Sequence, residues 1–256
     1  MVRAIVIAVM VVAVARMAHG QPATSDPAAV PISTDRPAVT DSSVVVPSGS
    51  LQVENGIAQT VNLGQTTYDG PETLLRFGVA SKTELRLTTP DYFGRVGMNS
   101  GFGDLAVGIK QQLGPTLGFD ISLVVSLSLP AGARAISSGG YDPSAQLPWS
   151  RSVSSNWTVA GMLSVYWPTE QGRRNTTGET TFLVDRQLTK AWDGFVEYAG
   201  DFPDRGGPRH LLHIGSAYKL TPHQQIDMHF GLGLSSTAVD HFIGVGYSFR
   251  LQAFRR

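Results

Sequence analysis

The chain has 256 residues, no cysteine, 28 glycines, 16% charged residues and a formal net charge of zero. Without cysteine there are no disulfides and no thiolate metal sites, and without a basic excess there is no basis for nucleic-acid binding. The charged fraction is well below the usual quarter of a soluble chain. Low charge and abundant glycine suit a β-barrel with an apolar outer face.

The first 20 residues have the pattern of an export signal. Arg3 supplies the positive charge, residues 4–15 form an apolar run, and Ala18 and Gly20 place small residues before a cleavage point. The run is shorter than the about 20 residues that a transmembrane helix needs. We therefore expect a signal peptide over 1–20; the alternative is an uncleaved N-terminal anchor.

Residues 21–50 are rich in Pro, Ser, Thr and Asp and show no sustained period. This composition predicts an extended periplasmic segment or linker. Asp35, Arg36 and Pro37 lie within it, shortly before the first predicted strand. They suggest either a plug folded into the periplasmic mouth of a barrel, or a plain turn in which Pro37 fixes φ.

The same stretch carries a family resemblance. Its residues Thr34-Asp35-Arg36-Pro37, Val46-Pro47-Ser48-Gly49 and Leu51-Gln52-Val53-Glu54 resemble the opening segment of a family of outer-membrane transporters named for the MetA pathway of phenol degradation. The resemblance continues through glycine-rich strands to Gly246-Tyr-Ser-Phe-Arg250. It implies a β-barrel that passes apolar compounds, and it brings no established site residues. Because the chain continues to residue 256, either Phe249 or Phe254 serves as the terminal assembly signal.

Twelve segments from Leu51 onward alternate apolar and polar residues with a period of two, which predicts β-strands. They are 51–63, 72–81, 83–90, 102–113, 118–130, 143–153, 157–167, 179–189, 192–201, 209–220, 223–235 and 239–251. Most approach the about 9–11 residues of a tilted membrane strand. A terminal strand in lipid must be closed over, because hydrocarbon offers no hydrogen-bond partner. The predicted fold is all-β: one antiparallel up-and-down transmembrane barrel over 51–256.

Apart from the eleventh, 236–238, which is short where a long one is due, the connections between these strands alternate in length, as in outer-membrane barrels with short periplasmic turns and long external loops. The expected short connections are 81–83, 114–117, 154–156, 190–191 and 221–222, and the expected long ones are 64–71, 91–101, 131–142, 168–178 and 202–208. Aromatic residues near strand ends predict girdles at both membrane interfaces: Tyr68, Tyr92, Phe93, Trp149, Trp157, Tyr166, Trp167, Trp192 and Tyr218.

Because side chains alternate between the two faces of a strand, the polar residues of each predicted strand should face the lumen. That face carries charges of both signs and two histidines. Its candidate lining residues are Glu54, Arg76, Glu84, Arg86, Asp104, Lys110, Asp120, Asp185, Glu197, Arg209, His213, Lys219, Asp227, His229, Asp240 and Arg250. They predict either a charge-lined conduit or a lumen filled by salt bridges. Twelve strands lie between about 8, which side chains fill, and about 16–18, which leave a channel. Inward glycines, such as Gly56 and Gly244, favour some internal space or simply strand curvature.

The six histidines show no spacing typical of a metal site. His210 and His241, with Ser235 and Ser236 nearby in the sequence, raise the alternative of an outer-membrane lipid-modifying hydrolase. There is no G-x-S-x-G elbow and no matching set of Ser, His and Asp or Asn. We expect no enzyme, no metal and no cofactor.

These patterns together predict an outer-membrane channel or transporter of a Gram-negative cell, passing small solutes passively; apolar or aromatic solutes are implied by the resemblance alone. The alternative from another class is a non-conducting barrel that acts as a surface structural or binding protein. Expected partners are outer-membrane lipids, the barrel-assembly machinery through the C-terminal strand, and a small-molecule solute. No nucleic acid is expected, and no strand stands out as an oligomer interface.

Overall fold

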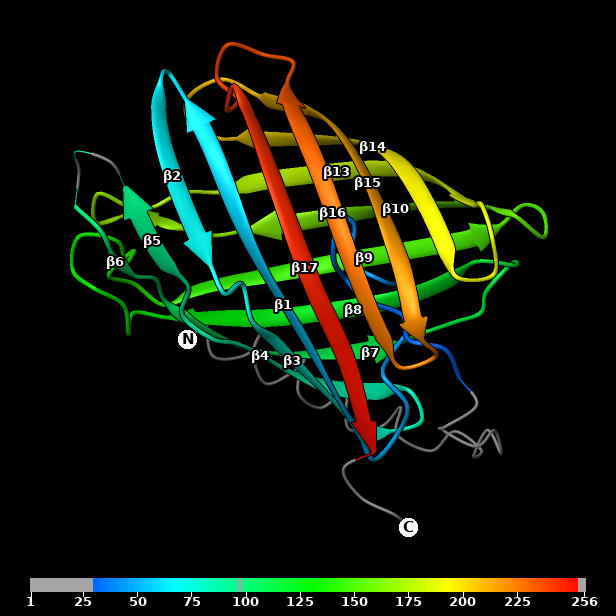
Figure 1. Cartoon of the computed structure of the whole chain (residues 1–256). Coiled ribbons are helices and arrows are strands. Elements are labelled where there is room, and N and C mark those ends of the chain that lie inside the picture. Colours follow the sequence, from blue (N-terminus) through cyan, green and yellow to red (C-terminus); the bar gives the residue numbers. More distant parts are fainter. Residues whose placement is uncertain (1–29, 96, 98, 253–256) are drawn as a thin grey trace.

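A computed structural model describes residues 30–95, 97 and 99–252. The predicted signal peptide and Phe254 therefore lie outside the described residues. The sheet contains fifteen strands. The strands that run around the barrel wall are here called staves, and the first and last of them, β1 and β17, pair with each other, so the sheet closes into a barrel (Figure 1). Among the described residues, no helix is long and apolar enough to cross a membrane.

Twelve staves make up the barrel, as predicted. They are β1 (Ser50–Asn62), β3 (Leu74–Ala80), β4 (Thr83–Thr88), β7 (Leu105–Gln112), β8 (Asp120–Leu129), β9 (Asp142–Ser152), β10 (Trp157–Tyr166), β13 (Thr177–Gln187), β14 (Trp192–Pro203), β15 (Arg209–Thr221), β16 (Gln224–Gly233) and β17 (His241–Gln252). Each pairs antiparallel with its neighbours, and the closing register runs from Ser50↔Gln252 to Val61↔His241. The prediction of an all-β, antiparallel, twelve-stranded barrel is confirmed.

Three further strands extend the early staves at the external end. β2 (Gln65–Gly70) pairs with the end of β1, β5 (Tyr92–Arg95) pairs with β2, and β6 (Gly101–Phe102) pairs with β5. The prediction of a long loop over 64–71 was wrong. Leu63 and Gly64 both have positive φ, 49° and 73°, so the chain reverses in a tight turn and continues as β2.

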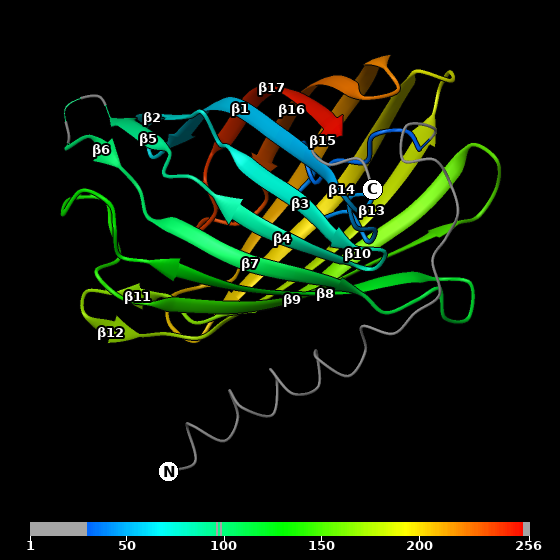
Figure 2. The ribbon, with the colours of Figure 1, turned by 90° about the horizontal axis from the view of Figure 1, so that it is seen from below.

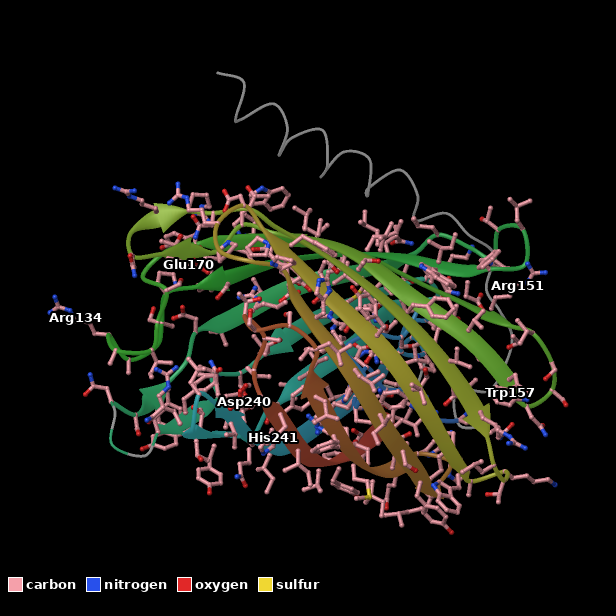
Figure 3. The ribbon with its side chains drawn as sticks, turned by 90° about the horizontal axis from the view of Figure 1, so that it is seen from above. Arg134, Arg151, Trp157, Glu170, Asp240 and His241 are labelled. Atoms are coloured by element: carbon pink, nitrogen blue, oxygen red, sulfur yellow. The ribbon has the colours of Figure 1, made fainter. Side chains whose placement is uncertain are left out.

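Two other predicted loops also contain short strands. β5 and β6 lie within or beside the expected loop 91–101, and β11 (Thr169–Glu170) and β12 (Arg173–Arg174) form a small hairpin inside 168–178 (Figure 2). Asp240, predicted to face the lumen from a strand, instead lies exposed in the loop before β17 (Figure 3). β11 and β12 have polar sequences, and β5 and β6 are short strands that pair only with β2 and with each other, so the lipid-driven alternation does not reveal them.

The two faces of the wall have opposite chemistry. Large apolar side chains are exposed on the outside, among them Ile57, Leu85, Leu163, Phe182, Val196, Ile214, Met228 and Val245, whereas buried side chains inside are mostly polar or charged. This inside-out distribution is what a barrel in hydrocarbon requires. Among the predicted girdle residues, Trp157, Trp192 and Tyr218 are exposed near the short turns, and Tyr68 and Tyr92 near the other end.

One predicted girdle residue points the other way. The Tyr166 hydroxyl accepts a hydrogen bond from Gln146 Nε2 at 3.1 Å and donates one to Glu179 at 3.0 Å, inside the barrel. The girdle prediction for Tyr166 is therefore wrong. Tyr166 does lie at the end of β10, as predicted. Side chains alternate between the two faces of a strand, however, and Tyr166 is on the same face as the buried Met162 and Ser164, so it points into the barrel.

Candidate functional site: the lumen and its inner segment

Residues 30–49, here called the inner segment, lie inside the barrel (Figure 2). They contain no helix or strand, and the wall supplies their hydrogen-bond partners. At one end the Ile32 amide donates to the Pro222 carbonyl at 2.7 Å, and near the other the Val46 amide donates to Glu84 at 2.7 Å. The stretch expected as an extended linker is thus placed against the inner wall over residues 30–49.

Asp35 lies at the centre of a charge cluster. Its carboxylate is 3.1 Å from Arg76 Nη1, 2.6 Å from Arg86 Nη1 and 3.1 Å from Lys110 Nζ, which come from β3, β4 and β7. Arg76 also pairs with Glu54 at 3.0 Å and with Glu84 at 2.9 Å. Because each of these charges has a partner of opposite sign at hydrogen-bond distance, none of them is buried unpaired.

The electrostatic setting of Asp35 and Asp41 differs. Burial alone would raise the pKa of Asp35, but the positive charges of Arg76, Arg86 and Lys110 outweigh it and hold that pKa below its usual range. Burial and the neighbouring Asp35 carboxylate raise the pKa of Asp41. Asp35 is therefore a permanent anion at neutral pH, while Asp41 takes up a proton under milder acid than an ordinary aspartate.

Arg36 fills space that two glycines leave open. Its guanidinium pairs with Glu72 and with Asp227, the latter at 3.3 Å. A Cβ built on Gly56, or on Gly246 across the β1–β17 seam, would collide with the Arg36 side chain. Glycine at these two inward positions thus lets Arg36 lie directly on the barrel wall.

The inner segment crosses the lumen and returns. The amides of Val39 and Thr40 donate to Glu197 on β14, at 2.8 and 2.7 Å. The Ser43 hydroxyl then meets Ser150 on β9 at 2.7 Å, and its carbonyl accepts from Ser122 on β8 at 2.5 Å. The segment is therefore tied both to β14 and to β8 and β9, which lie several strands further round the barrel.

Glu197 also begins a line of buried polar groups. Its carboxylate is 2.8 Å from His213 Nδ1, and His213 Nε2 is 3.0 Å from His229 Nδ1. The Phe195 and Phe242 rings pack against His213 at 5.3 and 5.2 Å between centroids. The histidines thus support the carboxylate that holds the tip of the inner segment.

The structure brings some predicted lining residues together and leaves others apart. Glu54, Arg76, Glu84, Arg86 and Lys110 gather around Asp35, Asp227 meets Arg36, and Glu197, His213 and His229 form the second group. The remaining ones are separate: Lys219 pairs with Asp193 at 3.0 Å, Arg209 with Asp201 at 3.1 Å, and Arg250 donates to carbonyls of the inner segment. Asp104 accepts the Gly132 and Ser138 amides, at 3.0 and 2.9 Å, and so anchors an external loop. Asp120 and Asp185 are half-buried on β8 and β13.

Two cavities remain inside the barrel beside the inner segment. One, of about 360 Å³, lies between that segment and the wall of β9 to β16, where Ser150, Thr158, Asp185 and Lys219 line it. The other, of about 160 Å³, is lined by Asp41, Arg86 and polar residues of β8 and β9 such as Ser126, Ser144 and Gln146. Most of the residues that line either cavity carry hydroxyl, amide or charged groups, so both can hold water and hydrophilic solutes.

A third hollow lies on the outer, apolar face. It has a volume of about 560 Å³ and is bordered by Ile57, Tyr68, Tyr92, Ile243 and Val245. Its lining also includes Gly70 and Gly94, where an added Cβ would approach Ile57 and Tyr92, so the missing side chains leave the depression between the larger ones. This hollow suits an apolar group approaching from the membrane side.

A comparison with protein families decides the relationship of the chain. A family model described as "Putative MetA-pathway of phenol degradation" matches residues 34–251. The chain belongs to this family. The resemblance read from the sequence is thereby confirmed, and the match includes most of the inner segment as well as all twelve staves.

Solved structures share the fold of this member of the MetA-pathway family. The COG4313 outer membrane channel from Pseudomonas putida F1 matches with a TM-score of 0.65 at 11% identity, covering 84% of this chain and 100% of that one. The NanC porin matches with a TM-score of 0.57 at 11% identity, covering 78% and 100%, and the KdgM porin with 0.53 at 14%, covering 77% and 98%. No curated protein sequence matches the chain. The fold is therefore that of outer-membrane channels and porins.

The residues proposed for a hydrolase are not arranged as a nucleophile and its base. Ser235 Oγ accepts from the His210 backbone amide at 3.1 Å and donates to the Pro208 carbonyl at 3.0 Å. The His210 ring instead meets the Tyr198 hydroxyl at 2.7 Å, and the His241 ring packs near Phe230. In the part of the chain that the structure describes, no three His, Cys, Asp or Glu residues gather as a metal site.

Sequence reasoning missed several residues of the inner segment in this MetA-pathway protein. Thr40, Asp41 and Ser43 make contacts as close as those of Asp35, and Glu72 pairs with Arg36. None stands in a periodic pattern, and their partners lie far away in the chain. The only local signal was the clustering of charged and hydroxyl residues over 33–43, which also fits an unstructured linker.

Proposed function

We propose that this chain is a passive outer-membrane channel for small solutes whose lumen is narrowed by its own inner segment. The observation that carries the proposal is that the inner segment, although bonded to the wall on all sides, leaves hydrophilic cavities of about 360 and 160 Å³ beside it. A barrel whose role was purely structural would have no need of two cavities with polar linings beside an internal segment. Membership of a barrel family with the fold of channels and porins supports the same reading.

In this proposal the inner segment acts as a plug, with Asp35, Arg36 and Pro37 at its start. Export requires the signal over 1–20, and insertion uses β17 as the strand presented to the barrel-assembly machinery. Membrane lipids surround the apolar outer face. The solute moves along the charge-lined and hydroxyl-lined inner wall without a cofactor.

The test is current through the purified mature protein in a planar bilayer, after heat-modifiable gel mobility has verified a closed barrel. We expect small stepwise currents from the wild type and larger ones after deletion of residues 30–49. A folded sample that carries no current in either form would overturn the channel and leave the non-conducting surface barrel. Lipid turnover that disappears in both Ser235→Ala and His210→Ala would instead favour the enzyme.

A second candidate is favoured by the hollow on the outer face. Its apolar border, with Tyr68, Tyr92 and Ile243, suits apolar or aromatic compounds that partition into the membrane. We expect a lipophilic photo-crosslinking aromatic to label this hollow and Gly94→Phe to abolish the labelling, with Gly178→Phe as a control outside it. Equal labelling of both variants would remove this candidate.

A further inference from the structure

Asp41 lies between the two inner cavities. It lines the cavity of about 360 Å³ and also that of about 160 Å³, and among the described residues no other side chain lines both. The chain on either side of it is tied down, at Thr40 to Glu197 and at Ser43 to Ser150. Asp41 is therefore held at a fixed point where one cavity ends and the other begins.

Asp41 faces Arg86 across this boundary. Its Oδ2 accepts from Arg86 Nη2 at 3.2 Å. The two side chains keep 15% and 10% of their surface exposed, whereas Arg76, Glu84 and Lys110 deeper in the cluster keep none. Asp41 and Arg86 are thus the most exposed side chains of the charge cluster.

The charge cluster, with this pair included, has one more carboxylate than it has basic groups. Four carboxylates, from Asp35, Asp41, Glu54 and Glu84, face three basic groups, from Arg76, Arg86 and Lys110. A charge at a narrow point with low-dielectric walls acts strongly on a passing ion, because water screens it poorly. Charged side chains at constrictions are a general means of ion selectivity in channels.

We infer that the Asp41–Arg86 pair is the constriction of the conduction path, and that it selects small hydrophilic solutes by charge, with cations preferred over anions. This inference rests on the proposed channel function. The hydroxyl and amide groups on either side, from Thr158 and Ser150 to Ser126 and Gln146, replace part of the hydration of a solute that reaches the pair. Asp41→Asn leaves three carboxylates against three bases, so the cation preference depends on this one side chain.

The first test is the reversal potential of single channels of the full mature protein in a KCl gradient. We expect Asp41→Asn to move it towards the chloride potential, and Asp240→Asn, in the exposed external loop, to leave it where the wild type has it. An unchanged reversal potential in a conducting Asp41→Asn channel would overturn the inference while the channel function stands. A folded wild type without current would overturn the channel function itself.

A second test uses the absence of native cysteine. Asp41→Cys should react with a charged methanethiosulfonate from either side of the bilayer, and the positive reagent should turn the channel towards anions while the negative one restores the cation preference. Asp185→Cys lines only the larger cavity and Gln146→Cys only the smaller one, so each should react faster from one side, and from opposite sides. Modified Asp41→Cys channels with unaltered current and selectivity would show that the path runs elsewhere.

Discussion

The Glu197 carboxylate accepts two hydrogen bonds from Thr40, one from the Thr40 backbone amide at 2.7 Å and one from the Thr40 hydroxyl at 2.6 Å, although the two residues are 157 positions apart. The same carboxylate accepts the Val39 amide at 2.8 Å. Buried amides without partners are costly, and at this turn of the inner segment one side chain satisfies two of them. Glu197 is therefore the main anchor on the far side of the lumen.

We expect Glu197→Gln to loosen the inner segment. The amide replaces one acceptor oxygen by a donor that faces other donors, and hydrogen bonds to a charged group contribute roughly 1.5–3 kcal/mol each. The time-averaged single-channel current should rise, with shorter closed periods. Glu170→Gln, in the exposed external hairpin (Figure 3), is the matched control and should behave as the wild type. Identical closed times in both variants would show that Glu197 does not restrain conduction.

We expect Asp35→Asn to destabilise the barrel. The variant leaves Arg76, Arg86 and Lys110 buried with one fewer counter-charge, and removing one partner of a buried ion pair costs about 3–5 kcal/mol. Urea unfolding followed by gel mobility should show an earlier midpoint than the wild type. A midpoint equal to that of the wild type would mean that water replaces the carboxylate at no cost.

The direction of the Asp35 pKa shift predicts how the stability of the protein should depend on pH. The basic neighbours hold this pKa below the ordinary value in the folded state, so the carboxylate binds protons more weakly folded than unfolded. Its stabilisation is complete above the unfolded pKa of about 3.9 and declines as pH falls through the folded pKa. Wild-type stability should therefore fall more steeply in strong acid than that of Asp35→Asn. Parallel curves for the two proteins would contradict this.

Acid should also weaken the proposed cation preference. This change should begin at a higher pH than the loss of stability that follows protonation of Asp35. Burial and the Asp35 carboxylate raise the pKa of Asp41, against the opposing charges of Arg86, Lys110 and Arg76, so Asp41 loses its charge above the range of an ordinary aspartate. Reversal potentials measured from neutral pH downwards should drift towards the chloride potential in the wild type. Asp41→Asn should show no such drift, since it has no proton to gain there.

Gly56→Ala should displace Arg36, because the new Cβ would occupy the position of its guanidinium. The segment would lose the Arg36 pairs with Glu72 and Asp227, so we expect higher conductance and a lower unfolding temperature on heat-modifiability gels. Gly178→Ala is the control, since a Cβ there meets nothing within 4 Å. Similar behaviour of the two variants would show that the close approach of Arg36 to the wall has no consequence.

The sequence predicted the wall of the barrel far better than its contents. A strand such as β8 repeats apolar and polar residues because each residue meets lipid or lumen in turn, and this local rule needs no knowledge of the neighbours. The inner segment follows no such rule. Its path depends on Glu84, Glu197 and Asp227, which are decided far along the chain, so its composition alone fitted a linker, a turn or a plug equally well. The short extensions β2 and β5 were missed for the same reason, since their pairing follows from the hairpin at the end of β1 and not from a long lipid-facing alternation.

The pairing of β1 with β17 sets an order of events during assembly. The twelve residue pairs of this seam join the first stave to the last residues that the structure describes. Gln225, Asp227 and Arg250, on the same final two strands, also contact Thr34, Arg36 and the carbonyls of Val30 and Pro31. The barrel thus cannot close before its C-terminal hairpin arrives, and these contacts at the start of the inner segment form only with that same hairpin. A nascent chain stalled before β16 would lack both the seam and these contacts. Closure of the barrel wall and attachment of the start of the inner segment to β16 and β17 therefore happen together.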